Sequence, residues 1–181
     1  MTQIVFNENK QEYVQQILDT CPPRFAQLED ADAITQLELA TFGDGPGHWR
    51  LQSHIKRVPM GTEVLYLDEQ LVGCIRGNMY PSKIAEHRPY GEISSLAIAT
   101  DYRGRGLGEL LLGRMIYSMS EEDPTGICLY TRKSNIAMQG LSAKFGFTVE
   151  ETIPDYYADP TEDAFFMVDR REPIPTHLPD K

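Results

Sequence analysis

The stretch Arg103-Gly104-Arg105-Gly106-Leu107-Gly108 determines how this sequence is interpreted. It follows the apolar run Ser95-Leu96-Ala97-Ile98 and precedes a segment to about Ser120 whose apolar residues recur at helical spacing. Glycines let backbone N–H groups approach a phosphate, and the start of a helix adds partial positive charge. The stretch therefore predicts a pyrophosphate-binding turn between a buried strand and a helix, with two arginines as cationic donors.

Two other interpretations of these glycines compete with this one. A dinucleotide-binding loop has the pattern G-x-G-x-x-G in a first β-α-β unit. Here the run Gly106–Leu111 lacks the third glycine and follows at least four expected strands. A purely structural glycine turn is the second alternative, and glycine spacing alone leaves it open.

The periodicity on either side of the turn predicts an α/β chain with a mixed sheet. Asp30 is the expected N-cap of a helix ending at Phe42. The strand 92–99 should be central, because its middle is apolar on both faces. We expect helices over 8–19, 30–42, 49–57, 107–120 and 135–145, and strands over 24–28, 63–67, 71–79, 92–99, 126–131, 147–153 and 164–169.

Length and charge limit the classes of function. The 181 residues suit one compact domain, which we place at 23–171, after a partly helical extension (1–22) and before a proline-rich, flexible tail (172–181). The net charge of −10 argues against nucleic-acid binding, which depends on Lys and Arg neutralising phosphates. An acidic surface instead attracts cations, including amines.

Location and metal binding are addressed by simpler patterns. No stretch approaches the roughly 20 apolar residues of a membrane helix, and the polar start does not resemble a secretory signal. Cys21, Cys74 and Cys128 are widely spaced without a C-x-x-C pair. We therefore expect reduced thiols, a cytoplasmic protein, no membrane partner and no metal site.

Several motifs together resemble the GNAT superfamily of N-acetyltransferases. Arg103-x-x-Gly106-x-Gly108 after the apolar strand resembles its coenzyme A-binding motif, R/Q-x-x-G-x-G/A. The run Leu129–Asn135 resembles the family's next strand and asparagine, and Gly146-Phe147 follows as in ribosomal-protein N-terminal acetyltransferases. Tyr156-Tyr157 resembles the tyrosine-rich last hairpin of N-terminal acetyltransferases. The resemblance covers about residues 24–170.

This resemblance implies a fold, a cosubstrate and its binding residues. The implied GNAT fold has a mostly antiparallel central sheet, helices on both faces and a V-shaped splay between the fourth and fifth strands. The implied cosubstrate is acetyl-CoA, whose arm would contact Asn135 and whose pantetheine would pair with the main chain of Leu96, Ala97 and Ile98. The implied pyrophosphate site is Arg103, Gly104, Arg105, Gly106, Leu107 and Gly108. Ser142 stands where the family often has a tyrosine that protonates the departing sulfur; it could hydrogen-bond the sulfur but is a poor acid.

The resemblance also implies which residues act on the amine. Glu92 opens the central strand, where several family members carry a general base. Tyr130 lies on the neighbouring strand at a position that holds Glu or His in related enzymes. Because the reference pKa of tyrosine is about 10, Tyr130 would orient a water or donate to the thiolate instead of acting as a base. Core packing is an alternative role for Tyr130.

The acceptor is the least determined feature of the sequence. At pH 7 an α-amino group is neutral far more often than a lysine, which favours a peptide or protein N-terminus. Tyr156 and Tyr157 can flank a peptide, and Phe42 and Trp49 are expected acceptor contacts beside the glycine-rich loop 43–49. A small amine (a polyamine, amino acid or amino sugar), a non-catalytic acyl-CoA sensor and a homodimer are all left open.

Overall fold

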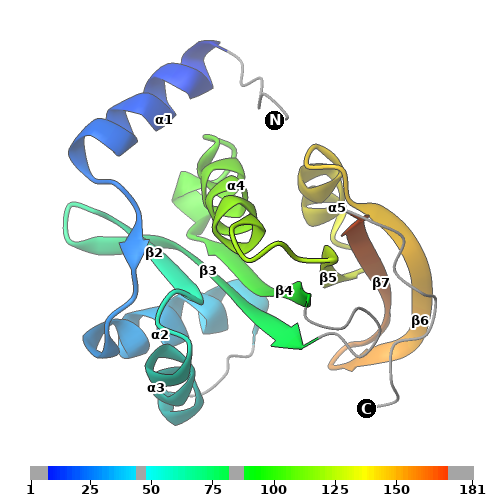
Figure 1. Ribbon diagram of the computed structural model, residues 1–181. Coiled ribbons are helices and arrows are strands. Elements are labelled where there is room, and N and C mark those ends of the chain that lie inside the picture. The colour runs from blue at the N-terminus through cyan, green and yellow to red at the C-terminus, as the bar shows by residue number, and fades with distance from the viewer. Residues whose placement is uncertain (1–7, 44–47, 82–87, 171–181) are drawn as a thin grey trace. The chain divides into compact units, whose positions relative to one another are not determined.

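The computed structural model describes residues 8–43, 48–81 and 88–170 of this chain (Figure 1). The helices are α1 (Glu8–Thr20), α2 (Ala31–Phe42), α3 (His48–Arg57), α4 (Leu107–Ser120) and α5 (Ile136–Ala143). The strands are β1 (Arg24–Phe25), β2 (Thr62–Leu67), β3 (Gln70–Pro81), β4 (Pro89–Ile98), β5 (Gly126–Arg132), β6 (Thr148–Ala158) and β7 (Thr161–Arg170). Among these described elements, none is a helix both long enough and apolar enough to cross a bilayer.

The predicted mixed α/β sheet is confirmed. Its strand order is β1-β2-β3-β4-β5-β7-β6. The pairs β1–β2, β2–β3, β5–β7 and β6–β7 are antiparallel, whereas β4 and β5 are parallel. The parallel register joins Gly91–Ile93 to Ile127–Leu129. The splay between the fourth and fifth strands stays a prediction.

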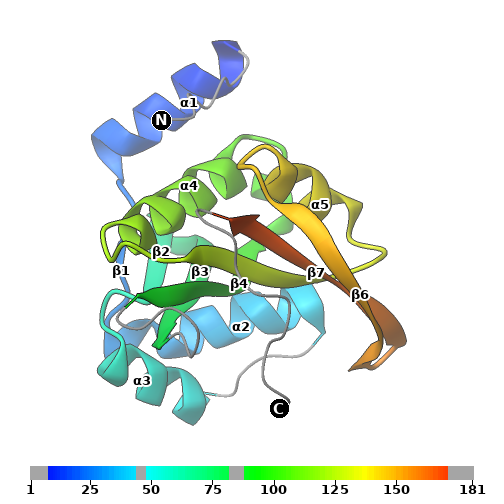
Figure 2. The same ribbon diagram turned by 45° about the vertical axis from the view of Figure 1, so that its right-hand side comes forward.

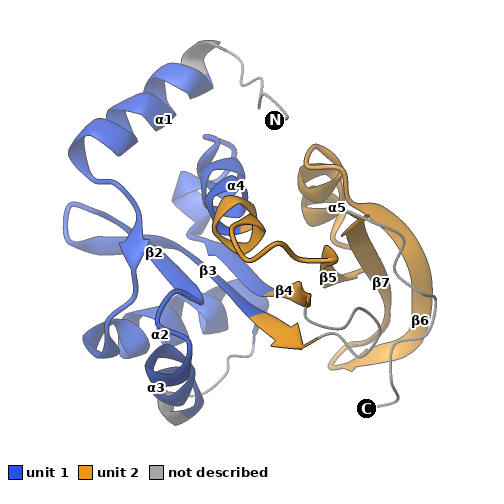
Figure 3. Cartoon of the chain, in the orientation of Figure 1, with its two compact units in different colours: residues 1–78, 94–115 blue, residues 79–93, 116–181 orange. Residues whose placement is uncertain are grey.

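The chain divides into two compact units (Figure 3). Unit 1 comprises residues 1–78 and 94–115, and unit 2 comprises residues 79–93 and 116–181. Both β4 and α4 therefore begin in one unit and end in the other. The single domain over 23–171 and the extension over 1–22 stay predictions, and the expected tail, 172–181, lies outside the described residues.

In unit 1, helices α2 and α3 cover one face of the strands (Figure 2). Their buried apolar side chains pack against residues of β2, β3 and β4, which forms the main core of this unit. The opposite face meets α4: a Cβ placed on Gly73 would lie 3.0 Å from side-chain atoms of both Ile98 and Leu111. The core members include Ile34, Leu37, Leu51, Ile55, Val64, Cys74 and Ala97.

The start of α2 corrects one expectation about Asp30. It occupies the N-cap position as predicted, but its side chain makes no capping bond. The carboxylate instead accepts hydrogen bonds from Arg24 (2.7 and 2.9 Å), from the Gln27 amide (2.7 Å) and from the Tyr66 hydroxyl (2.9 Å). Asp30 is buried and so needs these partners. It therefore ties β1, α2 and β2 together.

Two further boundaries differ from the sequence prediction. Strand β1 contains only Arg24 and Phe25, so the expected strand 24–28 is too long: Ala26 and Gln27 lie outside any regular element, and a 3₁₀ turn begins at Leu28. The predicted loop 154–163 is largely strand, because β6 continues to Ala158 and β7 begins at Thr161. The pairing register shifts between Ile153 and Tyr157, and Asp155 has φ +52°. This irregularity accommodates Pro154 within the edge strand β6.

In unit 2, the two faces of β5 and β7 have different neighbours. On one face, Cys128, Phe166 and Val168 form a core cluster with Tyr90, Tyr130 and Ile153 packed against it. On the other, Met167 lies beside Ser142 of α5. Helix α5 begins after Asn135 and is followed by Gly146, whose φ of +91° is the left-handed conformation expected after a helix end.

Candidate active site

The predicted phosphate-binding turn has the backbone that such a site needs. Gly104 (φ +75°) and Gly106 (φ +94°) both adopt the left-handed conformation that favours glycine. The amide of Leu110 donates to the Gly106 carbonyl at 2.9 Å, which is the first bond of helix α4. The first amides of a helix have no acceptor within the helix itself. These amides and the helix end suit an anion such as a pyrophosphate.

The two arginines brace this turn. The Arg103 Nε donates to the Ile98 carbonyl (2.9 Å), and the Arg105 Nη2 donates to the Asp101 carbonyl (2.8 Å). The Arg105 guanidinium also lies 5.4 Å from the ring centre of Tyr102 and 5.9 Å from that of Tyr13. Both arginine side chains are exposed, so their charge stays available to a ligand. The contact of α1 with this turn had no signal in the sequence.

Strand β4 is held by a buried polar group that sequence analysis missed. Glu38 of α2 is 1% exposed and accepts hydrogen bonds from Arg76 of β3 at 3.0 and 3.2 Å. The Ser95 hydroxyl donates to the same carboxylate. Further along β4 from Ser95, Ala97 is buried in the core, while Leu96 and Ile98 are half-buried. The buried ion pair therefore anchors β4 at the residue before Leu96.

In unit 2, Glu92 lies among tyrosines. It is the fourth residue of β4, not the first as expected, because the strand begins at Pro89. Glu92 pairs in parallel register with Cys128 of β5, so Tyr130, two residues further along, lies on the same face of the sheet. Tyr90 lies two residues before Glu92 and shares that face.

Stacked rings extend this cluster to the last hairpin. The rings of Tyr130 and Tyr156 are parallel within 3°, with centroids 5.1 Å apart. Tyr157 meets Tyr156 edge-on at 5.1 Å, and Phe166 lies 5.0 Å from Tyr130. The predicted residues Tyr130, Tyr156 and Tyr157 thus form one row of contacting rings, and the predicted residue Glu92 shares the sheet face of Tyr130.

The electrostatics of this group assign different roles to its members. Burial, with smaller contributions from Cys128, Glu92, Tyr156 and Tyr90, raises the pKa of Tyr130 well above its usual value. Burial and the charge of Glu92 raise the pKa of the Cys128 thiol to about 12. At neutral pH both groups therefore stay protonated. A carboxylate, with a reference pKa of about 4.3, is the better proton acceptor here.

The predicted residues near α5 have well-defined contacts. The Asn135 Oδ1 accepts the Met138 amide (3.0 Å) and so caps α5, a role compatible with a cofactor contact through the amide nitrogen. The Ser142 hydroxyl is fully buried, donates to the Met138 carbonyl at 2.7 Å and lies 3.5 Å from the sulfur of Met167. This burial speaks against a contact between Ser142 and a departing thiolate.

The expected acceptor loop is only partly described. Phe42 is the last residue of α2 and is 44% exposed, as an acceptor contact would require. Trp49 lies in the first turn of α3, and its side chain is outside the described residues. Residues 44–47 of the expected loop are likewise outside them.

Comparison with known proteins identifies the family. A putative ribosomal protein bS18-alanine N-acetyltransferase of Bacillus subtilis (strain 168) is 29% identical over 144 residues, which covers 80% of this chain and 91% of that protein. An N-alpha-acetyltransferase of Saccharolobus solfataricus is 27% identical over 154 residues, covering 80% and 89%. The crystal structure of the NatC complex bound to Gag peptide and CoA matches with a TM-score of 0.75 at 23% identity, over 82% of this chain and 96% of that one. Residues 14–147 match the acetyltransferase (GNAT) family, and the chain belongs to that family.

Proposed function

We propose that this protein transfers the acetyl group of acetyl-CoA to the α-amino group of a peptide or protein N-terminus. The observation that carries the proposal is the row of rings Tyr130, Tyr156 and Tyr157, with Glu92 on the same sheet face as Tyr130, in a chain of the GNAT family. A carboxylate beside flat, hydroxyl-bearing rings suits a peptide end that must lose a proton. The names of the two relatives point to the same acceptor class.

The residues proposed to bind acetyl-CoA are those that the sequence motifs indicate. The amides at the start of α4, with Arg103 and Arg105, would hold the pyrophosphate, and Gly106 leaves room for close approach. The main chain of Leu96–Ile98 would pair with the pantetheine arm, and Asn135 would donate to it. Acetyl-CoA supplies the thioester carbonyl that the amine attacks.

The proton chemistry is assigned to Glu92. An α-ammonium group has a pKa of about 7.7–8.0, so most of the acceptor is still protonated at neutral pH and a nearby carboxylate is needed to remove that proton. Glu92 accepts this proton directly or through a water, and the neutral nitrogen then attacks the carbonyl carbon. After the C–N bond forms, the C–S bond breaks, and the departing thiolate takes up the second N–H proton, directly or through a water, to give free coenzyme A.

The departing thiolate is expected to leave without an acid from α5. Ser142 is buried and donates within its own helix, so we leave it out of the proposed mechanism. Tyr130 stays protonated and can donate a hydrogen bond, but its raised pKa makes it a weak acid. A thiolate whose thiol has a pKa of about 8.5, by analogy with cysteine, is a fair leaving group by itself.

One experiment tests the acceptor class. Purified protein would be given acetyl-CoA with peptides bearing varied free N-termini and, in parallel, with polyamines, amino acids and amino sugars. Thiol release confined to the peptides, with mass spectrometry placing the acetyl group on the α-amine, is the expected result. Turnover confined to small amines would reject the proposal, and acetyl-CoA binding without turnover in either pool would favour a sensor. The cytoplasmic location and the homodimer stay predictions.

A further inference from the structure

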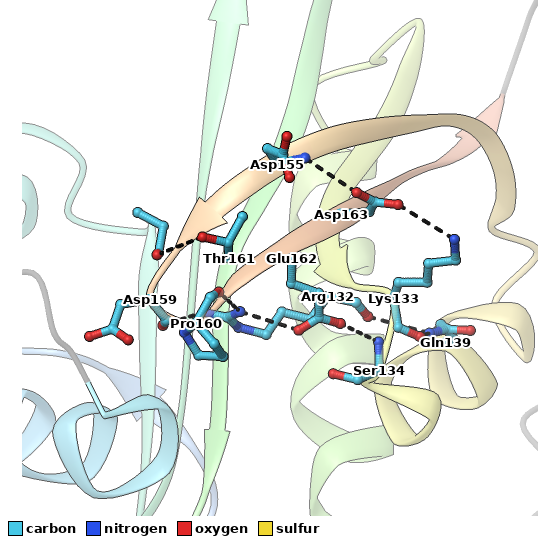
Figure 4. A network of polar contacts seen from close by, with 11 residues as sticks. Arg132, Lys133, Ser134, Gln139, Asp155, Asp159, Pro160, Thr161, Glu162 and Asp163 are labelled. Atoms are coloured by element: carbon cyan, nitrogen blue, oxygen red, sulfur yellow. Dashed lines mark hydrogen bonds and ion pairs between the residues drawn. The ribbon is translucent and has the colours of Figure 1, made fainter.

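A dense polar network joins the end of β5 to the tip of the β6–β7 hairpin (Figure 4). Its hub is the guanidinium of Arg132, the last residue of β5. This group donates to the carbonyls of Pro160 (3.0 Å) and Asp159 (2.9 Å) and pairs with the Glu162 carboxylate (3.2 Å). All three partners lie at or beside the turn of the hairpin. One side chain therefore fixes the path of that turn.

The same guanidinium lies over the ring of Tyr157, with its central carbon 4.2 Å from the ring centroid. Tyr157 in turn meets Tyr156 edge-on, and Tyr156 stacks on Tyr130. Arg132 is thus at the outer end of the row of rings that begins beside Glu92. Its contact sets the tilt of Tyr157, and through Tyr157 that of Tyr156.

Glu162 ties this arrangement to the turn between β5 and α5. Its carboxylate accepts the Ser134 amide at 2.6 Å as well as the Arg132 guanidinium. Lys133 adds a second link, because its amide donates to the Asp163 carbonyl at 3.1 Å. The hairpin tip is therefore held by main-chain and side-chain contacts to one short segment, 132–134.

We propose that Arg132 is a positioning residue that fixes Tyr156 and Tyr157 for binding the acceptor peptide. The inference rests on the proposed function, in which these tyrosines contact the peptide. Arginine suits the role because of its planar guanidinium group. The N–H groups at the edge of this plane can donate to two carbonyls and a carboxylate, while its face stacks on an aromatic ring. A lysine keeps the charge but cannot make all of these contacts together.

The same hairpin offers a matched control. At its other end, Arg170 of β7 donates to both Glu150 carboxylate oxygens of β6, at 3.0 and 2.6 Å. The two ion pairs are similarly exposed: 26% and 20% for Arg132 and Glu162, against 29% and 29% for Arg170 and Glu150. Among the described residues, the Arg132 pair contacts the turn and Tyr157, whereas the Arg170 pair lies at the opposite end of the hairpin. Arg170→Lys therefore replaces the arginine of a comparably exposed ion pair without changing the contacts at the hairpin tip.

The experiment compares Arg132→Lys with Arg170→Lys in the full chain. For Arg132→Lys we expect KM for the peptide to rise about tenfold, while kcat and the Kd of acetyl-CoA stay within about twofold. For Arg170→Lys we expect all three to stay within about twofold. Should Arg132→Lys fail to fold, Glu162→Gln replaces it, with an expected rise in peptide KM of about threefold.

Several outcomes would overturn the proposal: an unchanged peptide KM in Arg132→Lys, an equal rise in both variants, or a parallel rise in the Kd of acetyl-CoA. Hydrogen exchange of the amides in 156–162 gives a readout that needs no turnover. If the wild-type protein acetylates no peptide, the proposed function fails. Faster exchange in Arg132→Lys alone would still support the positioning role, and equal exchange in both variants would reject it.

Discussion

The ring of Tyr156 lies parallel to the ring of Tyr130, with 3° between their planes and 5.1 Å between their centroids. Tyr156 belongs to the edge strand β6, and Tyr130 belongs to the interior strand β5. Because β7 lies between these strands in the sheet, the stacking is not a neighbouring-strand contact. The register shift before Tyr157 accompanies this arrangement. The last hairpin therefore brings its tyrosines to the strand that pairs with Glu92.

We predict that Glu92→Gln lowers kcat/KM for the peptide about 10²- to 10³-fold, because the amide cannot accept the ammonium proton. The Kd of acetyl-CoA should not change. Steady-state thiol release and equilibrium binding would measure the two effects. Glu151→Gln, at an exposed position on β6, is the control and should retain full activity. A kcat/KM of Glu92→Gln within a few-fold of wild type across pH 6–9 would exclude Glu92 as the base.

We predict that Tyr130→Phe lowers kcat only about threefold to tenfold, because the phenylalanine keeps the ring stacking and loses one hydrogen bond. Burial, followed by its neighbours' charges, raises the pKa of Tyr130, so its hydroxyl stays protonated throughout pH 6–9. The shape of the pH–rate profile should therefore be unchanged. Loss of one limb of that profile in the variant would mean that Tyr130 exchanges a proton during turnover.

We predict that Gly106→Ala weakens acetyl-CoA binding as well as stability. A side chain at φ +94° costs about 1–2 kcal/mol of folding free energy, and it stands where the backbone should approach the pyrophosphate. Gly146→Ala is the matched control, with φ +91° and a new Cβ 3.7 Å from the Asp169 side chain. Both should lower Tm alike, and only Gly106→Ala should raise the Kd of acetyl-CoA. Equal affinities would remove Gly106 from the proposed site.

We predict that Asp30 makes unfolding sensitive to acid. Burial tends to raise the pKa of Asp30, but hydrogen bonds from Arg24, the Gln27 amide and Tyr66 outweigh it, and the pKa is lowered overall. Because the pKa of Asp30 is lower in the folded than in the unfolded protein, its ionised carboxylate stabilises the fold fully above the unfolded-state pKa of about 3.9. This stabilisation is lost as the pH falls through the folded-state pKa.

Chemical denaturation between pH 2 and 7 would measure this dependence. Asp30→Asn should lower the free energy of unfolding at pH 7 by about 2 kcal/mol. This loss is smaller than for a fully buried ion pair, because solvent screens the half-exposed Arg24. Below about pH 4 the difference between variant and wild type should shrink. A difference that stays constant over this range would show that the charge of Asp30 does not contribute.

The order of elements could be predicted from the sequence because it depends on local patterns. Short apolar runs indicated the strands, helical periodicity indicated α1 to α5, and the glycines marked the turn before α4. The errors fell at element ends. The two prolines and the aspartates of 154–163 suggested a loop, but the pairing of β6 with β7 and the packing of Tyr156 and Tyr157 keep most of the segment in strands.

The site was predictable only where residue type itself carries the chemistry. Gly106 and Glu92 could be singled out from the sequence, because backbone freedom and basicity are properties of the residue type itself. The ion pair of Glu38 with Arg76 joins residues 38 positions apart, and that of Arg132 with Glu162 joins residues 30 positions apart. No periodicity links such pairs, because they depend on how strands are ordered in the sheet.

The sequence by itself therefore determined the family and predicted the phosphate-binding turn and the candidate base, since these depend on short motifs with local physical causes. Tertiary structure alone decided how the tyrosines stack, which arginine holds the hairpin tip and that the hydroxyl of Ser142 is buried in its own helix. Such features arise when strand register and packing bring distant side chains into contact. Their energies depend on distance, burial and neighbouring charge, none of which is encoded at a single position.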